Sequence, residues 1–218
     1  VGRRVTWLTI YAVAMAYVES AVVVYLRAIY YPHGFDFPLA LMPPGMTAIE
    51  IGREAATLVM LLGVAALAGA DRWERFLGFC LSFGVWDIFY YAWLWIFLGW
   101  PPSLFTWDVL FLIPVPWIGP VLAPMIVSGL LVAGSLLLLR LKTDGVRLRV
   151  SARVWTLAVT GGLSVLGSFV LDFSSVMQQR VPAPFHWDAF AIGVGLAVAA
   201  LVIGVSRLER SSGSAPRL

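Results

Sequence analysis

Cysteine, histidine and charged residues are all scarce in this chain of 218 residues. The single cysteine, Cys80, excludes an internal disulfide bond. The two histidines, His33 and His186, lie outside the middle of every apolar run, which argues against haem ligation between helices. Charged residues make up 12% of the chain, against about a quarter in ordinary soluble domains, and this excludes a typical soluble domain.

Motifs that mark common soluble enzymes are also missing. The sequence contains no Gly-x-Ser-x-Gly elbow, no phosphate-binding glycine loop, no Cys-x-x-Cys and no His-Glu-x-x-His. It also lacks the Glu-x-x-His pairs with which helical bundles hold two iron ions. We therefore expect none of the reactions that these motifs support.

Long apolar runs are what the chain has instead. Hydrophobic residues make up 61% of it, and six runs are long enough to cross a bilayer at about 1.5 Å per helical residue. We predict an all-α polytopic integral membrane bundle, a single domain over 1–208 with a flexible cytoplasmic tail over 209–218. The predicted transmembrane helices are 5–30, 47–70, 75–99, 117–140, 154–178 and 188–206. The first run exceeds the length of a normal signal-peptide core, so we expect it to be the first span.

The fifteen basic residues predict how these spans are oriented. If both termini are cytoplasmic (N-in/C-in), only Arg27, Arg53 and Arg180 fall on the outer side, and the other twelve fall on the inner side. This asymmetry follows the positive-inside rule and suggests a multi-pass protein of a bacterial cytoplasmic (inner) membrane. It also explains the net charge of +3 without a nucleic-acid partner, so the expected partners are membrane lipids, other membrane subunits or a hydrophobic small molecule.

The connection between the third and fourth spans is rich in proline, with four prolines from Pro114 to Pro124. Proline removes a backbone donor and disfavours helix in the residue before it. We therefore predict a short interfacial or re-entrant segment on the outer side near 104–116, with a short helix over 104–113. A simple kinked connector is the alternative.

Three acidic residues have simple structural explanations. Thr47 and Glu50 match a capping box at the start of the second span. Asp108 and Asp188 each follow a tryptophan near the outer interface, where a carboxylate complements the dipole of an opening helix and the tryptophan anchors at the membrane surface. We therefore expect Asp108→Asn to cost little.

Four other carboxylates, Glu19, Glu54, Asp87 and Asp172, fall within the outer half or at the middle of their spans. A charge at this depth is costly, so such residues normally face the bundle interior and mark a function, although hydrogen bonds between helices are a structural alternative. The inner halves carry no Asp, Glu, Lys or Arg, so we predict an acid-rich pocket open to the outside and closed beneath by apolar packing. The predicted ligand-binding residues are Glu19, Glu54, Asp87, Asp172, Arg53, Asp188 and Tyr91.

A stripe of small residues follows the sixth span. Gly193, Ala197, Ala200 and Gly204 recur at spacings of three and four, so they share one helical face. Small residues at this spacing let two helices approach closely, and we interpret the stripe as a packing face.

Three functions fit the predicted pocket. The first is binding of a cation or metal, with an enzyme acting on a lipid-soluble substrate as an extension; a divalent metal ion would be the cofactor, and no catalytic residue is assigned. The candidate metal ligands are Glu19, Glu54, Asp87 and His186. The second function is transport of a small molecule or cation, which the apolar inner half disfavours. The third is a non-catalytic accessory subunit of a larger membrane complex.

Overall fold

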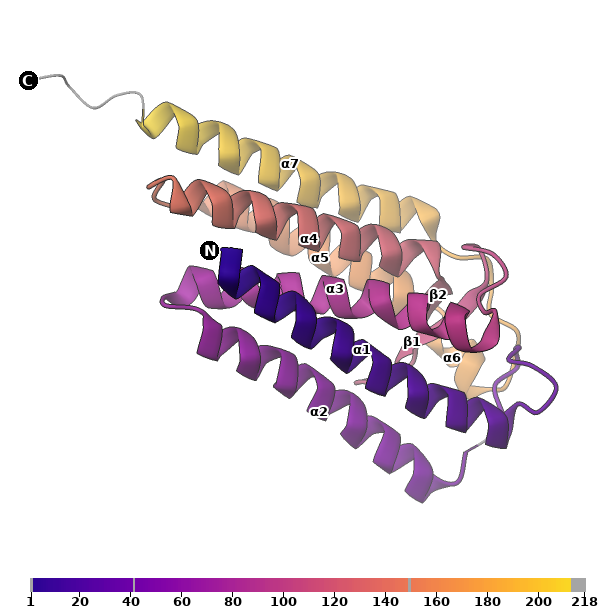
Figure 1. Cartoon of the computed structure of the whole chain (residues 1–218). Helices are drawn as coiled ribbons and strands as arrows, with labels where there is room; N and C mark the ends of the chain where they lie inside the picture. Colours follow the sequence, from indigo (N-terminus) through magenta and orange to yellow (C-terminus); the bar gives the residue numbers. More distant parts are fainter. Residues whose placement is uncertain (1, 41, 149, 213–218) are drawn as a thin grey trace, which may run out of the picture.

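Long helices lie side by side and run in alternating directions (Figure 1). The computed structural model describes residues 2–40, 42–148 and 150–212. The helices are α1 (Gly2–Tyr30), α2 (Pro44–Ala68), α3 (Arg72–Leu98), α4 (Leu122–Thr143), α5 (Ala152–Val170), the short α6 (Phe173–Met177) and α7 (Trp187–Ser212). Within the described ranges, six spans are long and apolar enough to cross a membrane, which indicates a multi-pass membrane protein.

The two ends of the bundle differ in their connections. At one end, where α1 begins and α7 ends, the connections are 69–71 and 144–151 (Figure 1). We call it the basic end because the sequence places most of the arginine and lysine residues there. At the other end the connections are 31–43, 99–121 and 178–186, and we call it the hairpin end. Since successive helices alternate in direction, every second connection falls at the same end.

A single residue defines each end of α3. Asp71 precedes α3, and its carboxylate accepts hydrogen bonds from the backbone N–H groups of Trp73 and Glu74. Gly99 ends α3 with a left-handed φ of 62°, a conformation that glycine adopts without steric cost. Both residues are therefore positioned by the usual chemistry of helix termini.

Helix α3 is the centre of the first part of the bundle. It packs against α1, α2 and α4, and the buried core between them includes Ala12 and Ala16 of α1, Leu61 of α2 and Leu81 of α3. Small alanines on α1 let the α1 and α3 backbones come close, because they add little bulk between the helices. From the basic end to the middle of the bundle the core is mainly apolar, with the buried hydroxyls of Ser82 and Ser135 within it.

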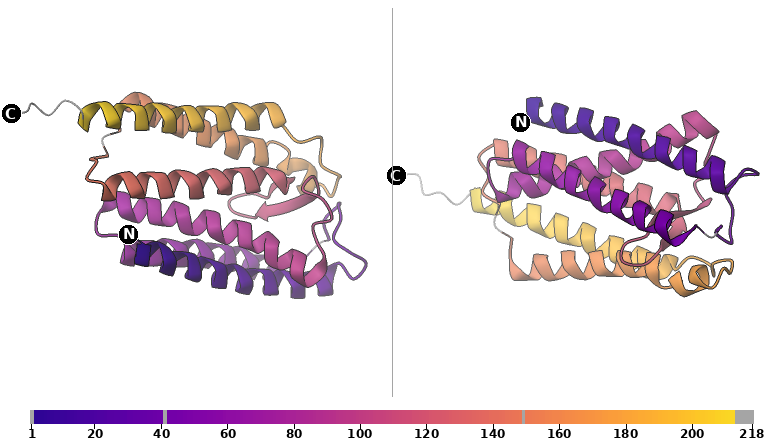
Figure 2. Two further views of the ribbon diagram at one scale, coloured as in Figure 1. Left: turned by 45° about the horizontal axis from the view of Figure 1, so that its top comes forward. Right: turned by 90° about the horizontal axis from the view of Figure 1, so that it is seen from below.

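Helices α5 and α7 form a separate, tightly packed pair (Figure 2). A Cβ atom added at Gly193 would lie 2.7 Å from the backbone oxygen of Gly161, and one added at Gly161 would lie 2.9 Å from the backbone nitrogen of Ala197. Only glycine fits at such a close backbone approach. The predicted packing face on the last span is confirmed.

A two-stranded antiparallel hairpin fills the centre of the bundle at the hairpin end. It consists of β1 (Trp107–Phe111) and β2 (Trp117–Pro120), with Asp108 paired to Gly119 (Figure 2). The Phe111 ring stacks on Phe83, near the middle of α3, and the Trp117 ring stacks on Phe169 of α5. The hairpin therefore reaches from the end of the bundle to about half its depth.

This hairpin corrects the prediction of a helix over 104–113. The segment forms a strand because prolines lie in the turn and at the end of β2, where they interrupt a helix but leave a short ladder intact. For the same reason the fourth span begins at Leu122 and not at 117. Helix α5 ends at Val170, and the predicted fifth span continues only as the short α6.

The segment 209–218, predicted as a tail, overlaps the last helix. Helix α7 continues to Ser212, four residues into that segment. Residues 213–218 lie outside the described residues.

Candidate functional site

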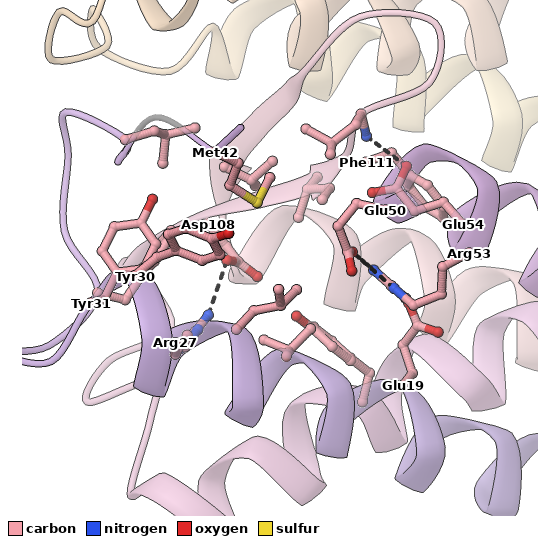
Figure 3. A pocket seen from close by; sticks show the side chains of 18 of the residues that line it. Glu19, Arg27, Tyr30, Tyr31, Met42, Glu50, Arg53, Glu54, Asp108 and Phe111 are labelled. Atoms are coloured by element: carbon pink, nitrogen blue, oxygen red, sulfur yellow. Dashed lines mark hydrogen bonds and ion pairs between the residues drawn. The ribbon is translucent and has the colours of Figure 1, made fainter. Parts of the chain in front are cut away.

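A cavity of about 150 Å³ lies at the hairpin end, among α1, α2, α3, β1 and the connection 31–43 (Figure 3). Its charged and polar lining consists of Glu19, Arg27, Glu50, Arg53, Glu54, Asp87, Tyr90, Tyr91 and Asp108. Aromatic rings that also line it are Tyr30, Tyr31, Phe35, Trp86 and Phe111. Four residues of the predicted pocket, Glu19, Glu54, Asp87 and Arg53, therefore meet, and Tyr91 joins them.

Arg53 joins two acidic residues on the α1–α2 side of the cavity (Figure 3). Its Nε and Nη2 donate to Glu50 Oε2 at 2.9 and 2.6 Å, and its Nη1 pairs with Glu19 Oε1. Thr57, four residues along α2, donates its hydroxyl to Glu19 Oε2 at 2.9 Å. Glu19 is thus held by two partners and Arg53 by two acids, so this cluster is already well satisfied.

The capping-box prediction for Glu50 is wrong. Helix α2 begins at Pro44, so Thr47 lies inside the helix and donates to the Pro43 carbonyl. The first turn is instead opened by proline, whose fixed φ suits that position. Glu50 lies in the second turn of α2, where its side chain is buried and accepts hydrogen bonds from Arg53.

Arg27 and Asp108 form a buried ion pair on the opposite side of the cavity (Figure 3). Arg27 Nη2 lies 3.3 Å from Asp108 Oδ1, and the Tyr91 hydroxyl donates to Asp108 Oδ2 at 3.1 Å. The Arg27 guanidinium carbon also lies 3.7 Å from the centroid of the Trp100 ring and 4.5 Å from that of Phe35. Hydrogen bonds and aromatic faces together fix this arginine in place.

The expectation that Asp108 lies at the start of a helix at the interface is wrong. It lies in β1, and only 2% of it is exposed. The strand carries it inward to Arg27, where loss of its charge leaves a buried cation unpaired. Substitution of Asp108 is therefore expected to be costly, contrary to what its position in the sequence suggests.

Glu54 and Asp87 are held by hydrogen bonds and by no ion pair among the described residues. Glu54 Oε2 accepts from the backbone N–H of Leu112 at 2.8 Å, and Asp87 Oδ2 accepts from the Ser128 hydroxyl of α4 at 2.7 Å. Across the part of the chain that the structure describes, neither carboxylate forms an ion pair. Both are nearly buried and both line the cavity.

The cavity therefore carries more negative than positive groups. Five carboxylates and two guanidinium groups line it, and the two arginines are engaged by Glu19, Glu50 and Asp108. An uncompensated carboxylate in a low-dielectric interior must be protonated or must receive a positive charge from elsewhere. The arrangement can hold a cation, because Glu54 and Asp87 offer acceptor oxygens that form no ion pair with a described side chain.

The predicted metal site gains no support. Among the described residues, no three His, Cys, Asp or Glu side chains are placed together to hold a metal ion. Glu19 is taken by Arg53 and Thr57, Asp87 is bound to Ser128, and His186 is not part of the cavity lining. Glu19, Glu54 and Asp87 line one cavity but are not grouped closely enough to ligate one ion, and His186 lies outside the lining.

Asp172 and Asp188 also lie away from the cavity. Asp172 precedes α6 and accepts hydrogen bonds from the Ser175 hydroxyl and the Ala183 backbone N–H, both at 2.6 Å, so it ties together the connection to α7. Asp188 falls in the first turn of α7, as its helix-opening interpretation predicted. The sequence predicted Asp172 inside the fifth span. Helix α5 instead ends at Val170, and no clear sequence signal marks that end.

Three charged residues of the lining were not among the predicted site residues: Arg27, Glu50 and Asp108. Arg27 looks like an ordinary flank of the first span, and only a three-dimensional contact reveals its partner. The alternation in Trp107–Phe111, followed by prolines and a second apolar run, is the signal that could have indicated a hairpin.

Comparison of the chain with protein-family models, curated proteins and solved structures finds no match. The site is therefore interpreted from its own geometry.

Proposed function

We propose that this protein binds a small organic cation in the cavity at the hairpin end. The observation that carries the proposal is the pair of carboxylates, Glu54 and Asp87, that line the cavity without a cationic partner among the described residues. A bound cation compensates charges that are otherwise costly at this depth. The proposal retains the predicted cation binding and narrows the class of cation.

The aromatic lining favours an organic ammonium ion over a metal ion. Tyr30, Tyr31, Phe35 and Tyr90 line the same cavity, and the faces of aromatic rings attract ammonium groups. A divalent metal ion instead needs several converging oxygen or nitrogen ligands. The cavity volume of about 150 Å³ equals that of a cavity that holds benzene, which sets the approximate size of the ligand.

We further propose that the hairpin end faces outward, with both termini in the cytoplasm of a bacterial cell. Nine described basic residues lie at the basic end, and they are Arg3, Arg4, Arg72, Arg75, Arg140, Lys142, Arg147, Arg153 and Arg207. Two of the three arginines at the other end, Arg27 and Arg53, are engaged in ion pairs within the bundle. The positive-inside rule then makes the basic end cytoplasmic and the hairpin a re-entrant segment from the outer side.

Binding fits the bundle better than transport does. Below the cavity, the core around Ala16, Leu61 and Leu81 contains no buried charged side chain among the described residues that could conduct a cation toward the basic end. A permeating ion needs groups that replace its hydration shell along the way. Enzymatic action on a lipid-soluble substrate and an accessory role in a larger complex both stay predictions.

The test is calorimetric titration of the purified protein in lipid nanodiscs with choline and with ethylammonium. At least one cation is expected to bind, and the neutral isostere of choline, 3,3-dimethyl-1-butanol, is expected not to bind. Glu54→Gln and Asp87→Asn should each weaken cation binding by at least about tenfold, because each removes a charge that faces the ligand.

Asp188→Asn is the matched control, since its carboxylate is exposed at the same end and lies outside the cavity lining. It should bind the cation as the wild-type protein does. The proposal is wrong if neither cation binds, if the neutral alcohol binds equally well, or if both cavity variants retain wild-type affinity.

A further inference from the structure

A second, larger cavity extends along the bundle from Val127, near the start of α4, to the basic end. This groove of about 510 Å³ lies between α4 and the α5–α7 pair and also borders the start of α3. Its walls are apolar, with residues such as Leu131 of α4, Ala158 and Gly162 of α5, and Leu201 of α7. No charged side chain among the described residues lines it.

The groove exists because the α5–α7 pair is attached to the rest of the bundle mainly at the hairpin end. There Trp117 of β2 stacks on Phe169, and the Phe169 ring packs against Phe185 and Phe190. Toward the basic end the pair lies apart from α4 (Figure 2). An apolar space of this size is roughly three times a benzene-binding cavity and needs an apolar occupant.

A basic cavity adjoins the groove. This space of about 550 Å³ shares Trp73 and Leu148 with the groove, and its charged lining consists of Lys142, Arg147 and the acidic Glu74. The Lys142 ammonium is shared with Glu74, at 2.7 Å, and with Asp71. Arg147 is exposed and forms no ion pair with any described side chain, so its guanidinium is available to an anion.

Two stacked tryptophans lie at the basic end of the groove, and one of them, Trp73, also lines the basic cavity. Trp73 of α3 and Trp155 of α5 both line the groove, and their rings stack with centroids 6.1 Å apart. Tryptophan is enriched at the level of lipid head groups, where one side of the ring is apolar and the other is wet. The pair therefore marks the depth at which a lipid tail gives way to its head group.

We propose that an anionic glycerophospholipid occupies this site, with an acyl chain in the groove and its phosphate beside Arg147. The three features match the three parts of such a lipid. The apolar groove would hold the acyl chain, the stacked tryptophans would lie beside the glycerol region, and the adjoining basic cavity would hold the phosphate. The surplus of basic residues at this end matches the negative charge of an anionic lipid. This site is separate from the cation cavity, and its occupant does not depend on that proposal.

Native mass spectrometry tests the site, with the protein in mild detergent and phosphatidylglycerol or phosphatidylcholine of identical acyl chains added in turn. The wild-type protein is expected to retain one phosphatidylglycerol about fivefold more than phosphatidylcholine, an effect of the size that one basic residue gives near an anionic surface. Gly162→Leu should lose the bound lipid, because a side chain there points into open space on the groove wall. Arg147→Gln should bring the two lipids to near parity.

Matched controls separate the site from the general lipid annulus. Gly195→Leu also places a leucine in open space, but on an exposed position of α7 outside the groove, and Arg140→Gln removes a charge at the same end outside the basic cavity. Both should retain the preferred lipid. If Gly162→Leu does not fold, as judged by circular dichroism, Ala158→Leu fills the same groove. Retention of phosphatidylglycerol by the folded filled variant, or equal retention of both lipids by the wild-type protein, overturns the proposal.

Discussion

The cavity at the hairpin end and the groove near the basic end belong to one bundle but are built by different forces. The cavity is small, and directional contacts from α1, α2, α3 and β1 fix its walls, as in the pairs Arg27–Asp108 and Arg53–Glu50. The groove is more than three times larger, and no charged described residue lines it. The shape of the groove depends on how far the α5–α7 pair lies from α4.

The difference indicates which region tolerates change. A network of buried charges has few acceptable arrangements, because each partner removed leaves another unpaired at high cost. An apolar wall next to lipid loses only packing when a side chain changes, and lipid replaces it. Substitutions in the charged cavity should therefore be costly, and those along the groove mild.

The largest effect is expected at Asp108. Asp108→Asn should lower the free energy of unfolding by about 3 kcal/mol, because the Arg27 charge stays buried without its anion. Unfolding in mixed micelles with increasing sodium dodecyl sulfate, followed by circular dichroism, measures the change. Asp36→Asn, at an exposed carboxylate of the same end, is the control. A loss below about 1 kcal/mol would mean that the pair contributes no more than one at the surface.

An intermediate effect is expected at Gly161, with its neighbour Gly162 as the matched control. A Cβ atom at Gly161 meets backbone atoms of α7 at 2.7 and 2.9 Å, whereas one at Gly162 meets nothing within 4 Å. Gly161→Ala should therefore cost about 2 kcal/mol through overpacking. Gly162→Ala should be neutral or gain up to about 1 kcal/mol, because alanine favours helix over glycine. Equal changes in the free energy of unfolding for Gly161→Ala and Gly162→Ala would contradict the contrast between the close α5–α7 contact and the open groove.

The smallest effect is expected at the surface of the basic end. The Lys142 ammonium, together with the N–H groups at the start of α3, holds the pKa of the Asp71 carboxyl below its ordinary value of 3.8. Because the folded pKa is the lower one, the stabilisation is complete above the ordinary value and is lost as the pH falls through the folded pKa. Unfolding midpoints from about pH 6 to about pH 2 should show a small acid loss that Asp71→Asn removes. If Asp71→Asn leaves the profile unchanged, the ion pair does not contribute.

Much of the fold could be predicted from the sequence, because spans depend on local composition. Apolar runs located six spans to within a few residues at most ends, and the stripe that includes Gly193 correctly predicted a close helix contact. The depth of Glu19, Glu54 and Asp87 in their spans placed them near one another, as the cavity lining shows. Position along a helix is enough for such predictions, since each residue adds a fixed rise.

What the sequence determined by itself is therefore the set of spans, the asymmetry of basic charge and the depth of most buried carboxylates. Only the tertiary structure decided that 107–120 folds as a hairpin, that Asp108 meets Arg27 eighty-one residues away, and that the α5–α7 pair leaves a groove beside α4. The physical reason is that composition and periodicity report the environment of one helix at a time. Ion pairs and grooves arise between elements, and their energy depends on distances that no local pattern contains.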